Sequence, residues 1–473
     1  MYGDMINQTS WRALVLVAGT ALAGFTPASA ADLGGNCCAD LEERIAELEA
    51  TTARKGNRKV SLEIGGQVNE AVMFWDDGGE SNAYVVTNDN ARTRFRFKGK
   101  AKINSDVEAG YALEIGVRSA NSKRFTQSND EGDDTATDVG FDLRDSYWFL
   151  KSKTYGGVSV GFQADASDAI TEINLTQTKD FAKLSDMEDF GLGLQLRSSS
   201  NGRLTGSGLS FRRLIGDAGD QPGDGDRRHN LVKYETPVFA GFTGQASWGE
   251  DDVWDLGLRY AGDFAGFKVA AGVAYGETTD GGDTNTSCNA TIGTAPNVDQ
   301  QCRQYGGSIS VLHESTGLFV SVGAGAKEDE LLDETVRFAG TGADDRQTFW
   351  ALQAGIERKW FPLGKTTVFG EYYEYEGGAN SRRTVGNNDA LDPFAGANPG
   401  AVWSTGLEAY GFGVAQGLDA AAMVVYLSYR HVEGDLTVRQ LNGPSPTGVA
   451  TGGLANVGLE DLDLVQAGAI IKF

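Results

Sequence analysis

Hydrophobic and polar residues alternate along most of the chain. Hydrophobic side chains occupy every second position across much of 60–74, and the same period returns at 107–118 and 267–275. Successive side chains of a β-strand point to opposite faces, so this period predicts strands with one apolar face. Runs of about ten such residues match tilted strands that cross a membrane. One sheet of a soluble sandwich has the same pattern, so a single strand does not distinguish the two.

The breaks between these segments are of two kinds. Short breaks at 104–106, 155–157, 236–241, 263–266, 315–317 and 362–365 alternate with long polar ones at 119–140, 277–303, 329–346, 378–403 and 434–460. Outer-membrane barrels combine short periplasmic turns with long external loops. The chain is therefore expected to be all-β, an antiparallel transmembrane β-barrel of about sixteen strands, with 165–228 as one long loop. If the segments FGLGLQLRSS and LTGSGLSF of that loop joined the wall, the count would be eighteen.

The first 58 residues differ from the rest. Arg12, the apolar run 13–25 and the small residues Ala28-Ser29-Ala30 predict a secretory signal peptide over 1–30, because the run is too short to span about 30 Å of hydrocarbon. Within 31–58, a spacing of four and then three residues separates Leu41, Ile45 and Leu48. This spacing predicts a short periplasmic helix with a coiled-coil seam. A trimeric coiled coil and a helix packed on its own barrel both fit it. The barrel is expected over 59–473.

Composition narrows the class of protein. The chain has 64 Gly and 9 Pro, and its net charge is −24 with a pI of about 4.5. Nucleic acid is excluded as a partner because phosphate binding needs a basic surface. Cys288 and Cys302 share one polar segment, which favours a loop-closing disulfide, whereas the adjacent Cys37 and Cys38 rarely suit such a bond. No Cys or His spacing suggests a metal site.

Basic residues occupy one face of a predicted strand over 91–103. They are Arg92, Arg94, Arg96, Lys98, Lys100 and Lys102. On a lipid-facing surface each would cost about 2–4 kcal/mol near the midplane, so the row is expected to face a water-filled lumen. The solvated face of a soluble sheet would show the same row.

A second charged segment, 164–190, is mainly acidic. Its carboxylates are Asp165, Asp168, Glu172, Asp180, Asp186, Glu188 and Asp189. If this segment folds into the barrel, its carboxylates would oppose the basic row, and rings of charge set the selectivity of channels. Solvation of an external loop is the alternative for each of them.

Several segments resemble alphaproteobacterial general porins, which are trimeric and sixteen-stranded. The resemblance rests on CCADLEERIAELEATT, VSLEIGGQVNEAVMFWDDG, VGFQADASDAITEINL, HNLVKYETPVFAGFTGQASWGEDD and the final alternating strand that ends at Phe473. It implies a homotrimer in the outer membrane, in contact with lipid and lipopolysaccharide, and a terminal Phe473 read by the barrel-assembly machinery. It also implies an inward-folded third loop over about 165–228 and, for some relatives, attachment to peptidoglycan near Ala31-Asp32.

The same resemblance assigns roles within the pore. It implies a constriction with the basic residues Arg92, Arg94, Arg96 and Lys98 and the acidic residues Asp165, Asp168 and Glu172. The function expected is a general diffusion porin that passes small hydrophilic solutes and ions, without catalysis or a cofactor. The sequence favours a near-balanced or mildly cation-selective pore, because the charge of −24 is spread over all parts of the chain.

Three other functions agree with only part of the sequence. An enzyme is disfavoured because His229, His313 and His431 lie in separate segments and no nucleophile or metalloprotease motif is present. A sugar-selective channel would need aromatic residues along the lumen, for which the candidates are Tyr372, Tyr373 and Tyr375. A structural barrel that tethers the outer membrane to the cell wall would suit the N-terminal helix and the long loops.

Overall fold

A computed structural model describes residues 59–473 except 133–139, 216–221, 225–227, 250–251, 280–300, 380–381, 395–397 and 446. The chain divides into a unit of residues 1–51 and a unit of residues 52–473, and all described residues belong to the second. The expected signal peptide (1–30) and helix (31–58), Cys37, Cys38 and Cys288 lie outside the described residues.

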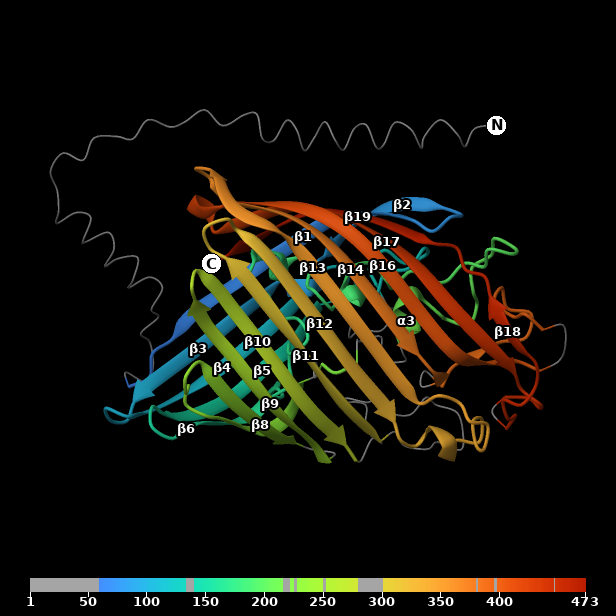
Figure 1. Cartoon of the computed structure of the whole chain (residues 1–473), viewed down its shortest axis with the longest axis horizontal. Coiled ribbons are helices and arrows are strands. Elements are labelled where there is room, and N and C mark those ends of the chain that lie inside the picture. Colours follow the sequence, from blue (N-terminus) through green and yellow to red (C-terminus); the bar gives the residue numbers. More distant parts are fainter. Residues whose placement is uncertain are drawn as a thin grey trace. The chain divides into compact units, whose positions relative to one another are not determined.

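The second unit is a closed antiparallel barrel (Figure 1). Among the described residues, sixteen strands form its wall: β1 (Glu63–Asp76), β3 (Arg94–Lys102), β4 (Val107–Arg118), β5 (Gly140–Ser152), β6 (Gly156–Ala164), β7 (Arg228–Glu235), β8 (Phe242–Gly249), β9 (Val253–Phe264), β10 (Phe267–Thr278), β11 (Cys302–His313), β12 (Leu318–Asp329), β13 (Arg346–Phe361), β14 (Gly364–Gly377), β16 (Gly400–Leu418), β17 (Met423–Gln440) and β19 (Leu462–Lys472). Gln67 of β1 pairs with Arg94 on one side and Lys472 on the other, which closes the ring. The prediction of sixteen strands is confirmed.

Three further strands lie beyond the wall. β2 (Ser81–Thr87), β15 (Thr384–Val385) and β18 (Leu454–Val457) extend the sheet where the long loops emerge, which we call the loop side. The short connections lie at the opposite, turn side. β17 continues to Gln440, so the last long loop begins later than the predicted 434, because Leu436 and Val438 still alternate as buried inward-facing residues.

The two faces of the wall differ in chemistry. Hydrophobic side chains that stay exposed gather on the outward face, where Trp148 and Phe412 are among the most exposed. An apolar outward band is what a barrel presents to lipid. The buried core instead lies inside the barrel, where Phe181 stacks on Tyr426 with ring centres 4.6 Å apart. The segment that carries Phe181 is therefore packed against the inner wall.

That segment is the connection of residues 165–227 between β6 and β7, called loop 3 below. It contains η2 (Gln177–Asp180), η3 (Met187–Asp189) and α3 (Phe211–Leu214), and α3 packs against β16 and β17. The two segments that raised the possibility of eighteen strands pair with each other, Gln195 with Ser210 and Arg197 with Leu204. The alternative of eighteen strands is wrong, because their apolar side chains are buried within the barrel: Leu192, Leu194, Leu196, Leu209 and Phe211.

Three more short 3-10 helices occur in the described residues, η1 (Asp89–Ala91), η5 (Leu332–Glu334) and η7 (Asp419–Ala421). No helix in the described part of the chain is long and apolar enough to cross a membrane.

Candidate pore and its constriction

The strand that carries the basic row begins later than the alternation of its residues predicts. Before it, the Asn88 side chain accepts a hydrogen bond of 3.1 Å from the Asn90 backbone N–H and caps η1. A side chain that satisfies the free N–H groups of a helix fixes where that helix starts. The strand therefore starts at Arg94, whereas 91–103 was predicted. Arg92 lies just outside the strand, and its side chain still lines the lumen.

One carboxylate holds three arginines on the inner wall. Glu114 of β4, only 1% exposed, accepts hydrogen bonds from Arg94 at 3.1 Å and from Arg144 at 2.8 Å, and it also pairs with Arg96. Hydrogen bonds between ionised groups are about twice as strong as neutral ones. The group keeps a positive charge because three guanidinium groups share a single carboxylate.

A β-bulge brings Arg144 into this cluster. Glu114 is opposite Asp145 and Ile115 is opposite Leu143, so Arg144 is the extra residue of β5. A bulge turns two consecutive side chains towards one face and often occurs near functional sites. Arg144 and Asp145 consequently both face the lumen, where Asp145 lies 3.5 Å from Arg228 at the start of β7.

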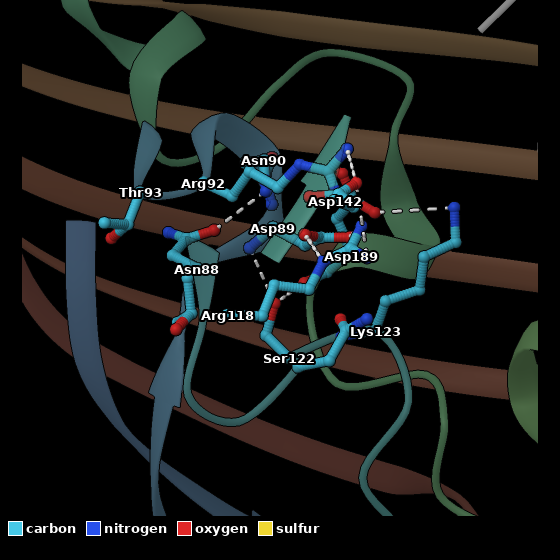
Figure 2. A network of polar contacts seen from close by, with 12 residues as sticks. Asn88, Asp89, Asn90, Arg92, Thr93, Arg118, Ser122, Lys123, Asp142 and Asp189 are labelled. Atoms are coloured by element: carbon cyan, nitrogen blue, oxygen red, sulfur yellow. Dashed lines mark hydrogen bonds and ion pairs between the residues drawn. The ribbon is translucent and has the colours of Figure 1, made fainter. Parts of the chain in front are cut away.

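A second network lies at the loop side of the row (Figure 2). Arg118 of β4 donates two hydrogen bonds to Asp89 of η1, at 2.9 and 3.2 Å. Asp142 of β5 lies 3.0 Å from one terminal nitrogen of Arg92. Burial alone would raise the pKa of Asp89, but Arg118 and Lys123 hold that pKa below its ordinary value. Asp89 therefore stays ionised and fixes η1 against the wall.

Loop 3 joins this network through loop 2, the connection after β4. Lys123 of loop 2 lies 3.1 Å from Glu188 and 3.5 Å from Asp189 of η3. The Ser122 hydroxyl donates a hydrogen bond of 2.5 Å to the Asp189 carbonyl. Burial raises the pKa of the Asp189 side chain to about 8, with Asp89 and Asp186 adding to the rise and Lys123 opposing it.

Other contacts attach loop 3 to the last strands of the wall. Lys472 lies 2.7 Å from Asp180, and the Arg430 guanidinium sits 4.4 Å from the centre of the Phe190 ring. Arg430 is itself held by Glu371 at 2.6 Å. Loop 3 is therefore attached to loop 2 at one end of these contacts and to β14, β17 and β19 at the other. Between them its backbone N–H groups donate hydrogen bonds to side chains of β8, β9, β11 and β13.

Two cavities remain within the barrel on either side of loop 3. The loop-side cavity, of about 830 Å³, is bounded by η1, loop 2 and loop 3. The turn-side cavity, of about 620 Å³, follows the basic row towards the short turns. Among the described residues, three line both cavities: Arg94, Asp168 and Arg228. We call these three residues the neck, since they lie where the two cavities meet.

The structure places the predicted pore residues as follows. Arg92 and Arg94 line the loop-side cavity, and Arg94, Arg96 and Lys98 line the turn-side cavity. Asp168 lies at the neck, and Glu172 lines the loop-side cavity, where it pairs with Lys183 at 2.7 Å.

Asp165 lines neither cavity. It is 3% exposed, and burial together with the carboxylates of Asp255, Asp168 and Asp224 holds its pKa well above the usual range. Its side chain lies between loop 3 and the wall, where the Ser167 hydroxyl donates a hydrogen bond to it at 3.3 Å.

Several lumen residues were not singled out from the sequence. Glu114 and Arg118 stood at alternating polar positions of a predicted strand, and that signal was available. Arg144 could not be found by a period of two, because the bulge shifts the register there. Arg228 and Arg259 line the loop-side cavity from the wall strands β7 and β9.

The remaining predicted residues are dispersed. Tyr373 and Tyr375 are buried in the inner core, and Tyr372 points to the outer face, where its ring packs on Trp350. None of the three lines either cavity. Cys302 opens β11, and the disulfide with Cys288 stays a prediction.

The predicted assembly signal lies at the seam of the barrel. The Phe473 carbonyl accepts a hydrogen bond of 2.8 Å from the Gly66 N–H, and its ring lies 6.0 Å from that of Phe95. In the described part of the chain, no cluster of three or more His, Cys, Asp or Glu side chains could hold a metal ion.

A family model for Gram-negative porins matches residues 13–437. The chain belongs to the Gram-negative porin family. With its closed barrel, the porin is a diffusion channel that crosses the outer membrane many times. No curated protein matches its sequence at a significant level.

Solved structures share the fold of this porin. An anion-selective porin from Comamonas acidovorans is 17% identical, with a TM-score of 0.50 over 88% of this chain and 100% of that one. OprB of Pseudomonas putida, at high pH, is 10% identical, with a TM-score of 0.52 over 92% and 97%. OmpT of Vibrio cholerae is 13% identical, with a TM-score of 0.48 over 89% and 99%. At these identities the likeness to the first two structures concerns the fold alone.

Proposed function

We propose that the porin passes small hydrophilic solutes and ions passively, and that the neck of Arg94, Asp168 and Arg228 sets the size of what passes. The supporting observation is that both lumenal cavities include these three side chains. Arg92, Arg96 and Lys98 extend the basic side of this constriction, and Glu172 extends its acidic side. No catalytic step and no cofactor are part of the proposal.

The setting of the channel is also proposed. The spacing of Leu41, Ile45 and Leu48 supports a homotrimer joined by a periplasmic coiled coil. A signal peptide over 1–30, a Cys288–Cys302 disulfide, membership of the alphaproteobacterial group, and contact with lipopolysaccharide and the assembly machinery complete the setting. Attachment to peptidoglycan near Ala31-Asp32 would be contradicted if proteolysis of purified cell wall never released this N-terminus.

Uptake of uncharged sugars into liposomes tests the proposed route. Vesicles that contain the purified, folded porin are placed in isotonic solutions of sugars of increasing size, and their swelling is followed by light scattering. We expect the rate to fall steadily with sugar size, and to rise for large sugars in the Arg94→Ala, Arg228→Ala double variant. Equal rates for variant and wild type would show that the neck is elsewhere.

A further inference from the structure

The charge around the lumen opposes the charge of the whole protein. Among the described residues, the loop-side cavity is lined by eleven basic and six acidic side chains, and the turn-side cavity by seven basic and six acidic ones. The full chain has 65 acidic and 41 basic residues. The excess of carboxylates therefore lies outside the path that a permeating ion follows.

Many acidic residues instead occupy the outer face near the loop side. Glu374, Glu408 and Glu433 stand opposite one another on β14, β16 and β17. Glu374 is two residues from Tyr372 and Glu408 two residues from Tyr410, and both tyrosines point outward. Residues two apart on a strand share a face, so these glutamates face away from the lumen. Because water and salt screen exposed charges over about 10 Å, this acidic rim acts only weakly on an ion at the neck.

The basic side of the path is continuous. Arg92, Arg94, Arg96, Lys98 and Lys100 line the loop-side cavity, the neck and the turn-side cavity in that order. We call these five residues the basic ladder. Alternate residues of a strand are about 6.6 Å apart, so an anion that leaves one cation meets the next within one hydrated diameter.

We propose that the porin selects anions, and that the basic ladder, above all Arg92 and Arg94 at its loop-side end, sets this preference. The inference rests on the proposed diffusion function and adds the charge of the preferred solutes. Asp168 is the opposing carboxylate at the neck and limits the preference. It keeps cations from being excluded.

The reversal potential in a planar bilayer tests the selectivity. The purified porin is placed between two concentrations of KCl, and the sign of the potential shows which ion permeates better. We expect chloride to be preferred. A potential that shows a preference for potassium would overturn the inference while leaving the diffusion function intact. Absence of any conductance would contradict the diffusion function itself.

Single substitutions locate the source of the preference. A unit charge about 5 Å from an ion in water changes the probability of finding that ion there by about fourfold. Arg94→Gln should therefore lower the chloride preference by up to this factor. Asp168→Asn should raise it. Arg94→Gln leaves Glu114 paired with Arg96 and Arg144, so the fold is retained. If Arg94→Gln changes the chloride preference no more than the control variant Arg303→Gln does, the basic ladder is not its source.

The matched control is Arg303→Gln. Arg303 pairs with Glu328 and Glu330 at the loop side and lines neither cavity. The Arg303→Gln variant loses the same charge as Arg94→Gln, but at a position outside the cavities. Its chloride preference should therefore equal that of the wild type.

Discussion

Glu114 is the residue on which the inner wall most depends. It is buried beneath Arg94, Arg96 and Arg144, and it is the common acceptor for all three. Without it, three positive charges would repel one another on the inner wall. Removing one partner from a buried ion pair is costly because it leaves the remaining charges uncompensated.

We predict that Glu114→Gln lowers the free energy of unfolding by about 2 kcal/mol, a value reduced from the fully buried case because water reaches the arginines. The measurement is the temperature at which the barrel unfolds in detergent. Unfolding is detected as a change in gel mobility. Glu108→Gln is the control, since Glu108 lies 3.9 Å from an exposed Lys100 and should shift the temperature little. Equal shifts in the two variants would contradict the role of Glu114.

Asp189 gives the lumen a response to pH. With a pKa of about 8, its side chain is neutral below that pH and negative above it. The groups that face it are Lys123, Asp89, Asp186 and Lys183. We predict that the preference for chloride falls as the pH rises through about 8, because one negative charge is added to the loop-side cavity. Reversal potentials from about pH 6 to about pH 10 measure it.

Asp189→Asn supplies the control for this response. Its side chain cannot ionise, so the chloride preference should stay nearly constant over the same range. A wild-type profile with no step near pH 8, or the same step in the variant, would contradict the assignment.

Single residues could be predicted from the sequence where regular alternation persists. Arg94, Arg96 and Lys98 were expected on the lumen face because a strand repeats every two residues, and they line the lumenal cavities. Asp165 was expected in the constriction but lies behind loop 3. Asp165 directly follows β6, and its place depends on how the first residues of loop 3 turn against β9, which a motif of a few letters does not contain.

Loop 3 is the element that turns an open barrel into a narrow channel. Phe181 attaches it to the far wall: the ring is fully buried, stacked on Tyr426 and in edge contact with Phe369 at 5.9 Å. Removal of a buried phenylalanine ring typically costs about 3–5 kcal/mol, through lost contacts and the cavity left behind.

We predict that Phe181→Ala loosens loop 3 and makes the open channel noisier, with a lower unfolding temperature. Single-channel recording measures the current fluctuations. Phe412→Ala is the control, because Phe412 is exposed on the outward face and does not contact the loop. An equally quiet current in Phe181→Ala and wild type would show that other contacts hold the loop.

Elements were predictable to different degrees. The wall followed from alternation and from the contrast between short turns and long polar loops, since each strand carries its own periodic signal. The pairing of Gln195 with Ser210 inside loop 3 did not follow, because a hairpin in the lumen and a hairpin in the wall have the same local pattern. Only the packing of the whole barrel decides between them.

At the scale of the molecule, closure of the barrel pairs the first and last strands of the sixteen-stranded wall with each other. β1 and β19 form the seam, and the backbone of Phe473 makes two hydrogen bonds with Gly66, at 2.8 and 3.1 Å. An open edge would expose unpaired backbone groups to lipid, which is strongly unfavourable. The final residue therefore takes part in closing the barrel, beside its predicted role in assembly.

We predict that deletion of Phe473 lowers the amount of folded porin in the outer membrane. Phe473→Tyr keeps the ring and the backbone, so it should assemble nearly as the wild type does. The measurement is the heat-modifiable fraction in isolated outer membranes. If the deletion variant refolds normally from urea into detergent yet fails to assemble in cells, the deletion affects recognition by the barrel-assembly machinery and not the stability of the barrel. Normal assembly in cells would contradict the predicted signal.

The central claim is that loop 3 and the inner wall leave one open, water-filled path through Arg94, Asp168 and Arg228. Single-channel conductance of the purified porin in a planar bilayer tests it most directly. We predict stepwise, long-lived openings, and a larger step for the Arg94→Ala, Arg228→Ala double variant. A folded, heat-modifiable barrel that conducts no ions, or a double variant whose step equals that of the wild type, would contradict the claim.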